Sequence, residues 1–340
     1  MEFKTRLPFI RARAPLRISF AGGGTDIKEY YELHGGAVTS ATIAKYNYAT
    51  LRPREDEKFR IREESFGIDY SGSINKKLEE TEKSRFFNAI MNYFSPKKGF
   101  DLITHSDVTY GSGLGSSSTM VVALVGAFNS WLNLNMTNYE IAATAYKIER
   151  QDLAIEGGMQ DQYAATFGGF NFIEFSKSDV VVNQMRLKRS TIYDLQFRAL
   201  LVNTGATRQS SQIIKKQKSK LSDREILKHY EEIKKLAVEV KNRLYKDQLD
   251  DLGPILTEEW KHKKMLSPGI SNENIDAIFK MADENGATGG KLLGAGGGGY
   301  ALLLTDEENR QRLITALSKK FEVNTIEFVP SGLEVWTRNE

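Results

Sequence analysis

The sequence predicts an α+β protein with two domains, residues 1–190 and 191–340. Its 340 residues are enough for two domains of ordinary size. In the first part, β-like and helical stretches follow one another without an internal repeat. Beyond about Phe197 the character changes, because residues 209–282 are helix-rich and carry many Lys and Glu side chains.

The composition is that of an ordinary globular protein, with 40% hydrophobic and 27% charged residues. A net charge of +3 is small for this length and gives nucleic-acid binding little support. The absence of cysteine excludes disulfides, thiolate metal sites and a cysteine nucleophile. No apolar run approaches the ~20 residues that cross a bilayer, and no signal-peptide core follows the N-terminal charges. We therefore expect a cytoplasmic protein without nucleic-acid or membrane partners, and a homodimer is left open.

In the first part of the chain, strands rich in β-branched and aromatic residues alternate with glycine turns and short helices. Thr25 or Asp26 is a candidate N-cap of the first helix, which Gly35 and Gly36 end. Up to the loop near residue 110 we expect strands over 9–20 (interrupted at Ala14-Pro15), 37–52, 58–63 and 100–108, and helices over 25–32 and 83–94.

After that loop the pattern becomes more helical. Thr137 and Glu140 have the spacing of a capping box, which predicts a helix continuing to about Leu153. We also expect helices over 120–132, 159–163, parts of 209–282, and 307–320, and strands over 170–175, 180–187, 198–203, 325–329 and 333–337.

The loop that leads into the helix over 120–132 is the strongest functional signal in the sequence. Residues 111–118 place three glycines and four serines directly before an apolar run. Glycines let backbone N–H groups approach a ligand, and a helix N-terminus offers unpaired donors and partial positive charge, which suits phosphate oxygens. The alternative is a capped helix after a flexible turn.

Three common phosphate-binding motifs do not fit this loop. It lacks the Gly-Lys-Ser/Thr of Walker A. A dinucleotide site needs an acidic residue ~20 positions on, and none occurs between Gly115 and Glu140. The catalytic and magnesium motifs of protein kinases are also absent.

Three glycine-containing stretches occur in order: residues 14–26 (APLRISFAGGGTD), 113–117 (GLGSS) and 291–299 (KLLGAGGGG). Together they span most of the chain, and they resemble the motifs of the GHMP small-molecule kinases, named after galactokinase, homoserine kinase, mevalonate kinase and phosphomevalonate kinase. Thr109 departs from the family pattern, which usually has proline at this position. Without proline the entry to the loop should be less rigid, but the chemistry of the site should be unchanged. The resemblance implies an N-terminal ribosomal-protein-S5-like domain and a C-terminal ferredoxin-like domain, with ATP and Mg²⁺ as cofactors.

The resemblance also implies which residues hold ATP and magnesium. Ser117 would contribute to magnesium binding, and Glu149, which precedes Asp161 by 12 residues, would be the second ligand. A mid-helix glutamate is otherwise a solvent-face residue or an i,i+4 partner. The implied ATP-binding residues are Gly111, Ser112, Gly113, Leu114, Gly115, Ser116, Ser117 and Ser118.

Asp161 matches the family's catalytic aspartate, which accepts the proton of the sugar hydroxyl or orients that hydroxyl. Its alternative is a stabilising carboxylate at a helix N-terminus. Arg17 aligns with a basic residue near that aspartate and the transferred phosphoryl group; its alternative is an exposed strand arginine. Gly296 and Gly297 would approach the nucleotide and acceptor through their backbone, whereas Lys291 either touches a phosphate or solvates a strand end.

The first stretch carries information on the acceptor. Galactokinases have Gly-Glu-His-Thr-Asp where this chain has residues 22–26 (GGGTD). The chain keeps the aspartate, Asp26, but lacks the glutamate and histidine, and this difference disfavours galactose as the acceptor. With residues 160–165 (QDQYAA), the stretch closely resembles the D-glycero-D-manno-heptose 7-phosphate kinases, which phosphorylate the anomeric hydroxyl to give the 1,7-bisphosphate for nucleotide-activated heptose. Fucokinases are the nearest alternative. The implied substrate-binding residues are Gly23, Gly24, Thr25, Asp26, Arg208, Gly296 and Gly297.

The acceptor's distal group separates these alternatives. A heptose 7-phosphate carries a dianion far from the reacting hydroxyl and needs cations, whereas fucose carries a methyl group and needs an apolar wall. Arg208 follows a strand and opens a helix, and Arg11 and Arg13 are further candidates; each is otherwise ordinary surface charge. The non-enzyme alternative is a catalytically silent sugar and ATP sensor, which the presence of Asp161 and Glu149 disfavours.

Overall fold

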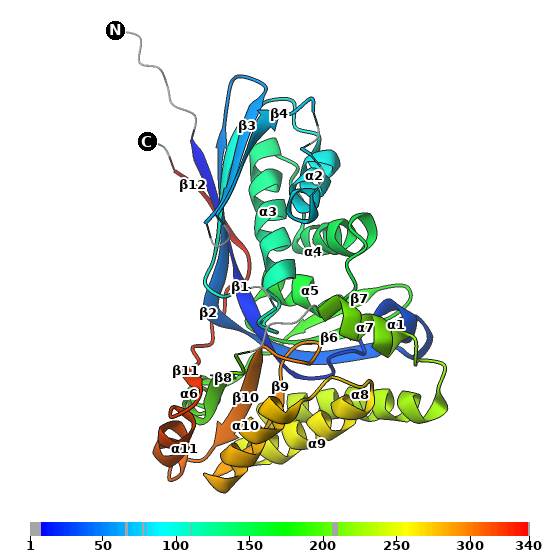
Figure 1. The fold of residues 1–340 in the computed structure, drawn as a ribbon, viewed down its shortest axis with the longest axis vertical. Helices are drawn as coiled ribbons and strands as arrows, with labels where there is room; N and C mark the ends of the chain where they lie inside the picture. The colour runs from blue at the N-terminus through cyan, green and yellow to red at the C-terminus, as the bar shows by residue number, and fades with distance from the viewer. Residues whose placement is uncertain are drawn as a thin grey trace.

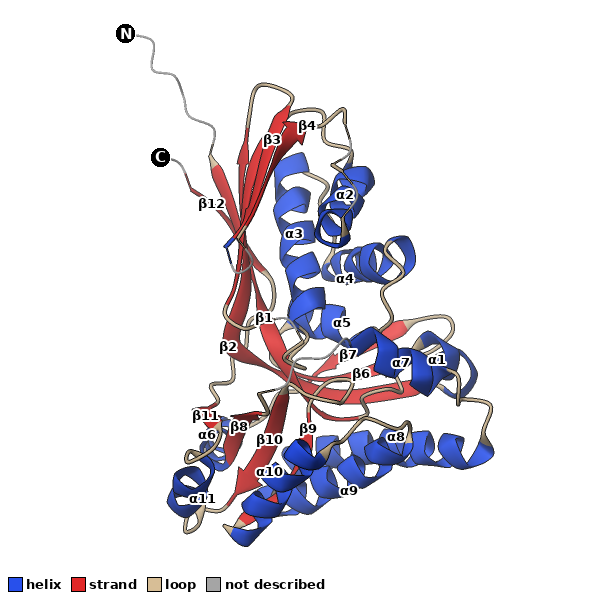
Figure 2. Cartoon of the chain, viewed as in Figure 1, coloured by secondary structure: helices blue, strands red, loops and turns tan. Residues whose placement is uncertain are grey.

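The structure, a computed structural model, describes residues 8–64, 67–76, 78–79, 81–109, 111–205 and 210–338. Within these residues the strands form a sheet of eight and a sheet of four, with helices packed against both (Figures 1 and 2). The predicted mixture of α and β structure is confirmed. The larger sheet contains β1 (Phe9–Ala21), β2 (Gly36–Pro53), β3 (Lys58–Glu63), β4 (Ile68–Ser73), β5 (Phe100–Ser106), β6 (Phe170–Phe175), β7 (Val180–Gln184) and β12 (Glu334–Arg338).

The larger sheet is built on the long pair β1 and β2. Its strand order is β12-β1-β2-β5-β3-β4, with β6 on the first part of β2 and β7 beside β6. The expected interruption at Ala14-Pro15 is a register shift between Pro15 and Leu16, after which Arg17 lies opposite Thr42. Proline cannot donate to the ladder, so a shift at this point preserves a continuous strand.

Helices cover one face of this sheet (Figure 2). The middle of α3 is apolar on all sides and buried from Met120 to Phe128, as expected for a helix enclosed by a sheet and other helices. The predicted capping box is confirmed, because Thr137 and Glu140 bond each other's backbone N–H. These helices are α2 (Glu82–Phe94), α3 (Ser116–Leu132), α4 (Asn138–Tyr146) and α5 (Gln160–Phe167).

The smaller sheet has the strand order β11-β8-β10-β9. Its strands and helices follow a β-α-β-β-α-β succession, which is the ferredoxin-like arrangement that the family resemblance implies. The strands are β8 (Ala199–Asn203), β9 (Ala287–Leu292), β10 (Tyr300–Thr305) and β11 (Glu322–Thr325); the helices are α7 (Ser210–Lys218), α8 (Arg224–Tyr245), α9 (Leu252–Met265), α10 (Glu273–Glu284) and α11 (Arg310–Leu317).

An apolar layer joins the two sheets. It includes Leu16 of β1, Leu236 of α8 and Leu302 of β10, all within one buried cluster. The Thr39 hydroxyl of β2 donates to the carbonyl of Ala237 at 2.7 Å, which fixes α8 against the larger sheet. The later part of β1 therefore lies where the two sheets meet (Figure 1).

The chain returns to the larger sheet near its end. β12 pairs antiparallel with β1, with Phe9 opposite Arg338 and Arg13 opposite Glu334. The larger sheet thus includes a strand from beyond residue 191, and a boundary between 190 and 191 stays a prediction. No helix in the described part of the chain has the length and apolarity needed to cross a bilayer.

Several elements differ from the prediction. The expected strand over 325–329 is wrong: β11 ends at Thr325, and Phe328 makes only an isolated bridge to Ile43. The helix over 137–153 is α4 followed by a π-helical segment, Lys147–Asp152. Strand β4 and helix α6 (Arg189–Arg198) were not expected, nor was the 3₁₀ turn Leu249–Asp251.

The first helix also starts later than expected. Helix α1 is Lys28–His34, and Ile27 at its N-cap position makes no side-chain cap hydrogen bond. The predicted cap by Thr25 or Asp26 is therefore wrong. The Thr25 hydroxyl bonds instead to the carbonyl oxygens of Gly22 and Ala37, at 2.8 and 3.0 Å, inside the protein.

Candidate active site

A cavity of about 260 Å³ opens where the loop before α3 meets the turn after β1. Its walls come from residues of β1 and the following turn, from the 111–118 loop, from residues 149–161, and from α7. Lys263 of α9 and Lys291 of β9 complete it. The three stretches that the sequence singled out are thus brought to one place.

The 111–118 loop delivers the start of α3 without a side-chain cap. Gly115 occupies the N-cap position at φ 78°, and no side-chain cap hydrogen bond is made there. The Ser116 hydroxyl points into the protein, 3.2 Å from that of Ser106. A helix N-terminus without a side-chain cap leaves backbone N–H groups unpaired beside the cavity, and such groups suit phosphate oxygens. Leu114 is buried and does not line the cavity.

The third glycine stretch packs directly against this loop. A Cβ on Gly113 would lie 2.5 Å from the carbonyl oxygen of Leu293, so only glycine permits this approach. The backbone N–H of Tyr300 donates to Ser112 O at 2.9 Å. Gly296 and Gly297 lie outside the cavity lining, and Gly297 N donates to Ile270 O at 2.8 Å. Gly296 and Gly297 therefore contribute to the fold of the third glycine stretch and not to the cavity wall.

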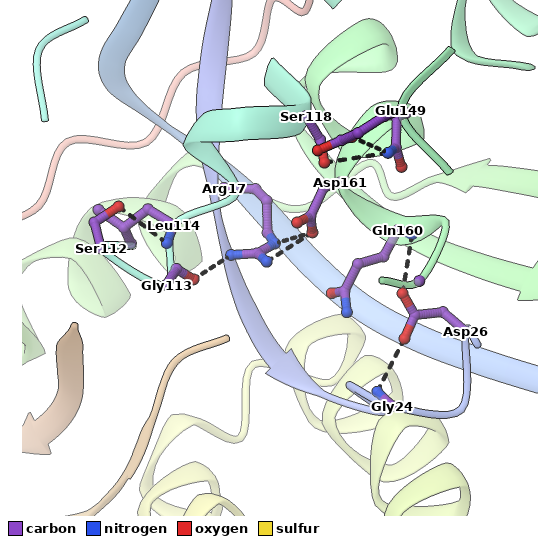
Figure 3. Close-up of polar contacts among 12 residues, drawn as sticks. Arg17, Gly24, Asp26, Ser112, Gly113, Leu114, Ser118, Glu149, Gln160 and Asp161 are labelled. Carbon is purple, nitrogen blue, oxygen red and sulfur yellow. Dashed lines mark hydrogen bonds and ion pairs between the residues drawn. The ribbon is translucent and has the colours of Figure 1, made fainter. Parts of the chain in front are cut away.

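Arg17 and Asp161 form a pair at the base of the loop (Figure 3). Nε of Arg17 donates to Oδ1 of Asp161 at 2.7 Å, and Nη1 donates to the carbonyl of Gly113 at 2.6 Å. Arg17 is 3% exposed, so it is not the exposed strand arginine of the alternative. A charge-assisted pair held this deeply fixes the carboxylate in place.

Ser117 and Glu149 lie side by side. The Ser117 hydroxyl donates to Oε1 of Glu149 at 2.7 Å, and Nε2 of Gln162 donates to Oε2 at 2.7 Å. Glu149 is fully buried in the π-helical segment, which excludes the solvent-face alternative. π-Helical insertions frequently occur at functional sites. Arg150 accompanies the pair, with Nη1 3.3 Å from Oε1 of Glu149.

This pair has the chemistry of a partial magnesium site. The described residues contain no cluster of three or more His, Asp or Glu side chains able to hold a metal. Mg²⁺ does not need one, because it takes one or two protein oxygens together with waters and substrate phosphates. Ser117 and Glu149 both line the cavity beside the start of α3, so their oxygens fit such an ion.

The turn after β1 supplies the opposite wall. Oδ1 of Asp26 accepts from Gly24 N at 2.9 Å, and Oδ2 accepts from Gln160 N at 3.1 Å (Figure 3). A Cβ on Gly158 would lie 1.9 Å from Oδ2, so glycine is required there. Asp26 therefore joins the first glycine turn to the segment that carries Asp161.

Sequence reasoning missed part of the cationic wall. Lys263 and Glu259 stand four residues apart on α9, a spacing typical of a solvated surface pair, yet both are buried. Nζ of Lys291 lies 2.9 Å from Oε1 of Glu259. Burial lowers the pKa of Lys263 to about 8, with the Glu259 carboxylate opposing the shift. Burial likewise lowers the pKa of Lys291, which borders the cavity rather than solvating a strand end.

The arginines proposed for a distal phosphate have other positions. Arg13 donates to Glu334 at 2.5 Å and stacks over Tyr46, outside the cavity lining. Arg11 is exposed and lies opposite Trp336 in the β1–β12 pair. Arg208 lies outside the described residues.

Comparisons with known proteins agree with the motifs. The GHMP kinases N terminal domain matches residues 83–169, and the GHMP kinases C terminal domain matches residues 240–323. The chain is 41% identical to a D-glycero-alpha-D-manno-heptose 7-phosphate kinase of Campylobacter jejuni, over 96% of this chain and 98% of that protein.

A solved structure and a plant enzyme extend the comparison. The crystal structure of a D-glycero-D-manno-heptose 1-phosphate kinase from Bacteroides thetaiotaomicron matches with a TM-score of 0.81 and 30% identity, covering 96% of this chain and 98% of the other. A bifunctional fucokinase/GDP-fucose pyrophosphorylase of Arabidopsis thaliana is 26% identical over 89% of this chain and 31% of that protein.

Proposed function

The chain belongs to the GHMP kinase family, and we propose that it transfers a phosphoryl group from ATP to the anomeric hydroxyl of D-glycero-D-manno-heptose 7-phosphate. The product is the 1,7-bisphosphate. The observation that carries this proposal is the ion pair of Arg17 and Asp161 in the same cavity as the uncapped start of α3. The 41% identity to a heptose 7-phosphate kinase supports the acceptor.

The 111–118 loop binds the phosphates of ATP in this proposal. Backbone N–H groups at the start of α3 donate to phosphate oxygens, and the partial positive charge of the helix N-terminus favours them. Gly113 and Leu293 are packed too closely to admit a side chain, so the third stretch supports the loop from behind. Positioning and charge neutralisation of this kind supply most of the catalysis of phosphoryl transfer.

Asp161 accepts the proton of the reacting hydroxyl. Arg17 holds Oδ1, and Oδ2 has no hydrogen-bond partner among the described residues, so Oδ2 is available to the anomeric hydroxyl. As the bond to phosphorus forms, the hydroxyl's proton passes to Asp161 and the bond from the γ-phosphorus to the bridging oxygen of ADP breaks. The guanidinium of Arg17 stabilises the charge that develops nearby.

Ser117 and Glu149 are the residues that would hold magnesium. Their oxygens are 2.7 Å apart at the start of α3. A bound Mg²⁺ there would neutralise the charge of the β- and γ-phosphates. Arg150 and Gln162 hold the Glu149 carboxylate in place from the protein side. We expect the reaction in the cytoplasm, where ATP is available, and the product would feed the synthesis of nucleotide-activated heptose.

A fucokinase-like activity is the second candidate, supported by 26% identity to the plant enzyme. The cavity wall argues against it, because Lys263 and Lys291 are buried cations in a lining where the methyl group of fucose needs an apolar surface. A silent sensor would bind both ligands without turnover. It would have no need for the Arg17–Asp161 pair.

Coupled ADP release with purified protein tests the proposal. The panel is heptose 7-phosphate, fucose, galactose and mevalonate, each with ATP and magnesium. We expect turnover with heptose 7-phosphate and none, or very slow turnover, with the others. Turnover with an unphosphorylated sugar alone would refute the assignment, and binding of ATP and sugar phosphate without turnover would favour the sensor.

A further inference from the structure

Lys263 is a buried cation that has no ion-paired carboxylate in the part of the chain that the structure describes. Lys263 is 5% exposed and lines the cavity. Its Nζ donates one hydrogen bond, of 2.8 Å, to the carbonyl oxygen of Gly23. An ammonium group carries three donor hydrogens, so donors remain for a ligand.

The nearby carboxylates leave the charge of Lys263 only partly compensated. Oε1 of Glu259 is 2.9 Å from Nζ of Lys291, and its Oε2 makes no hydrogen bond within the described residues, so neither oxygen is paired with Lys263. Asp26 directs its two oxygens to the backbone N–H groups of Gly24 and Gln160. A buried charge without full compensation costs free energy, and a bound anion removes that cost.

The other cations of the cavity are committed elsewhere. Among its described lining residues, Arg17 is bound by Asp161 and the Gly113 carbonyl. Arg150 is bound by the Ser118 hydroxyl and by the carbonyl of Gly158. Lys263 is therefore the cation best placed to receive an acidic group of the acceptor.

The position of Lys263 identifies which acidic group this is. Arg17 and Asp161 mark the end where the hydroxyl reacts, and Gln160 lies between that pair and the Gly24–Asp26 turn (Figure 3). Lys263 contacts this turn through Gly23. We therefore place the ammonium group beside the part of the acceptor that meets the Gly23–Asp26 turn.

Two neutral groups accompany Lys263. Oγ of Ser19 and Oε1 of Gln160 are buried and have no hydrogen-bond partner among the described residues. A Cβ on Gly23 would lie 3.5 Å from Ser19 Oγ and 3.6 Å from Gln160 Nε2, so this part of the wall is narrow and polar. Both residues line the cavity, so a bound ligand would supply the partners that these two atoms lack.

We propose that Lys263, together with the Ser19 hydroxyl, binds the distal phosphate of the acceptor and thereby selects a sugar phosphate over an unphosphorylated sugar. The inference rests on the proposed function, because it concerns the acceptor of that same cavity. The phosphomonoester dianion compensates the ammonium charge, and the Ser19 O–H donates to a phosphate oxygen. Gln160 Oε1 accepts from a sugar hydroxyl between the two ends.

The test compares two acceptors that differ only in this group: D-glycero-D-manno-heptose 7-phosphate and the same heptose without phosphate. The variant is Lys263→Met, which removes the charge and keeps the length of the side chain. Lys264→Met is the matched control, because Lys264 is the next residue on α9, exposed, and has its ammonium over the Trp260 ring. Steady-state kinetics are measured at saturating ATP, with ATP affinity as the check on folding.

We expect Lys263→Met to lower kcat/KM for the heptose 7-phosphate roughly 10- to 100-fold, mainly through KM. Turnover of the unphosphorylated heptose should change less than about twofold, the loss expected when no charged contact is removed. Lys264→Met should change neither. If Lys263 only supports the Gly23 turn, both acceptors lose turnover equally, and that result, or no loss at all, overturns the inference.

Two further measurements keep the inference testable. If Lys263→Met does not fold, the variant Ser19→Ala tests the inference instead. Its kcat/KM should fall about 5-fold for the phosphorylated acceptor and stay unchanged for the unphosphorylated one. An equal loss toward both acceptors would refute it. Failure of the proposed function is seen separately, since wild-type protein would then not turn over heptose 7-phosphate in the first place.

Discussion

Two nitrogens of Arg17, Nε and Nη2, lie 2.7 and 2.6 Å from the same oxygen of Asp161, Oδ1. The third, Nη1, donates to the Gly113 carbonyl. One guanidinium therefore ties the proposed base to the phosphate loop and to strand β1. It also leaves the second carboxylate oxygen without a hydrogen bond from Arg17, so the proposed mechanism needs no rearrangement of this pair before the substrate binds.

Asp161→Asn should abolish most turnover without weakening ATP binding. The amide keeps the size of the side chain but cannot accept the hydroxyl's proton, so we expect kcat to fall about 10³-fold. Coupled ADP release measures the rate, and isothermal titration measures ATP affinity. An unchanged rate would show that Asp161 is not the base.

Glu149→Gln should raise the magnesium concentration needed for half-maximal activity by about 10-fold, because the isosteric amide removes the ligand's charge. Titration of activity with MgCl₂ at fixed ATP measures this change. Asp152→Asn is the matched control, since Asp152 lies in the same π-helical segment but is exposed and outside the cavity. Equal responses of the two variants would argue against a magnesium role for Glu149.

Gly113→Ala should separate the third glycine stretch from the phosphate loop. Its Cβ would approach Leu293 O to 2.5 Å, in addition to the strain of φ +79°. Gly67→Ala carries similar strain, at φ +61°, but meets nothing within 4 Å. We expect the control to lose about 1 kcal/mol of unfolding free energy and Gly113→Ala to lose a further 1–3 kcal/mol or so. Urea denaturation measures both, and equal losses would contradict the packing argument.

Lys263 should make the stability of the unliganded protein depend on pH. Its pKa falls from 10.5 in the unfolded chain to about 8 when folded. Below pH 8 both states are protonated and the folded state bears the cost of the buried charge. Between pH 8 and 10.5 the folded state loses its proton first, so this group adds up to roughly 3 kcal/mol to the unfolding free energy as pH rises.

The difference between wild type and Lys263→Met isolates this contribution from other titrating groups. Urea denaturation at pH 7.5 to 9.5 should show the unfolding free energy of wild type rising relative to that of the variant. Lys264→Met should follow wild type, because its side chain is exposed. A constant difference across this pH range would mean that the pKa of Lys263 is not lowered in the folded protein.

Much of the fold followed from the sequence wherever local pattern decides structure. Strand β3 was predicted with its observed bounds, and the Thr137–Glu140 capping box was correct, because both depend on neighbouring residues. Residues 325–329 alternate apolar and polar side chains like a strand. They bury Ile326 and Phe328 without joining a ladder, so tertiary packing overrode the pattern.

Residues of the candidate site that lie within recognisable motifs could be predicted from the sequence. Arg17 and Asp161 could be named from their stretches, and the structure brings them together. Lys263 could not, because a Glu and a Lys four residues apart on a helix predict a surface pair. The π-helical segment around Glu149 could not be predicted either. Its wider turn changes the spacing of apolar residues, but a segment of this length is too short for that spacing to be recognised in the sequence.

The pairing of β12 with β1 affects how the protein can be made. Residues 334–338 close one edge of the strand that carries Arg17, and their partners are residues 9–13. A growing chain on the ribosome holds that edge unpaired through the synthesis of everything between, and unpaired edges invite association with other chains. Strand β1 therefore keeps an unpaired edge until residues 334–338 have been made, so the strand that carries Arg17 depends on a late segment of the chain for protection from such association.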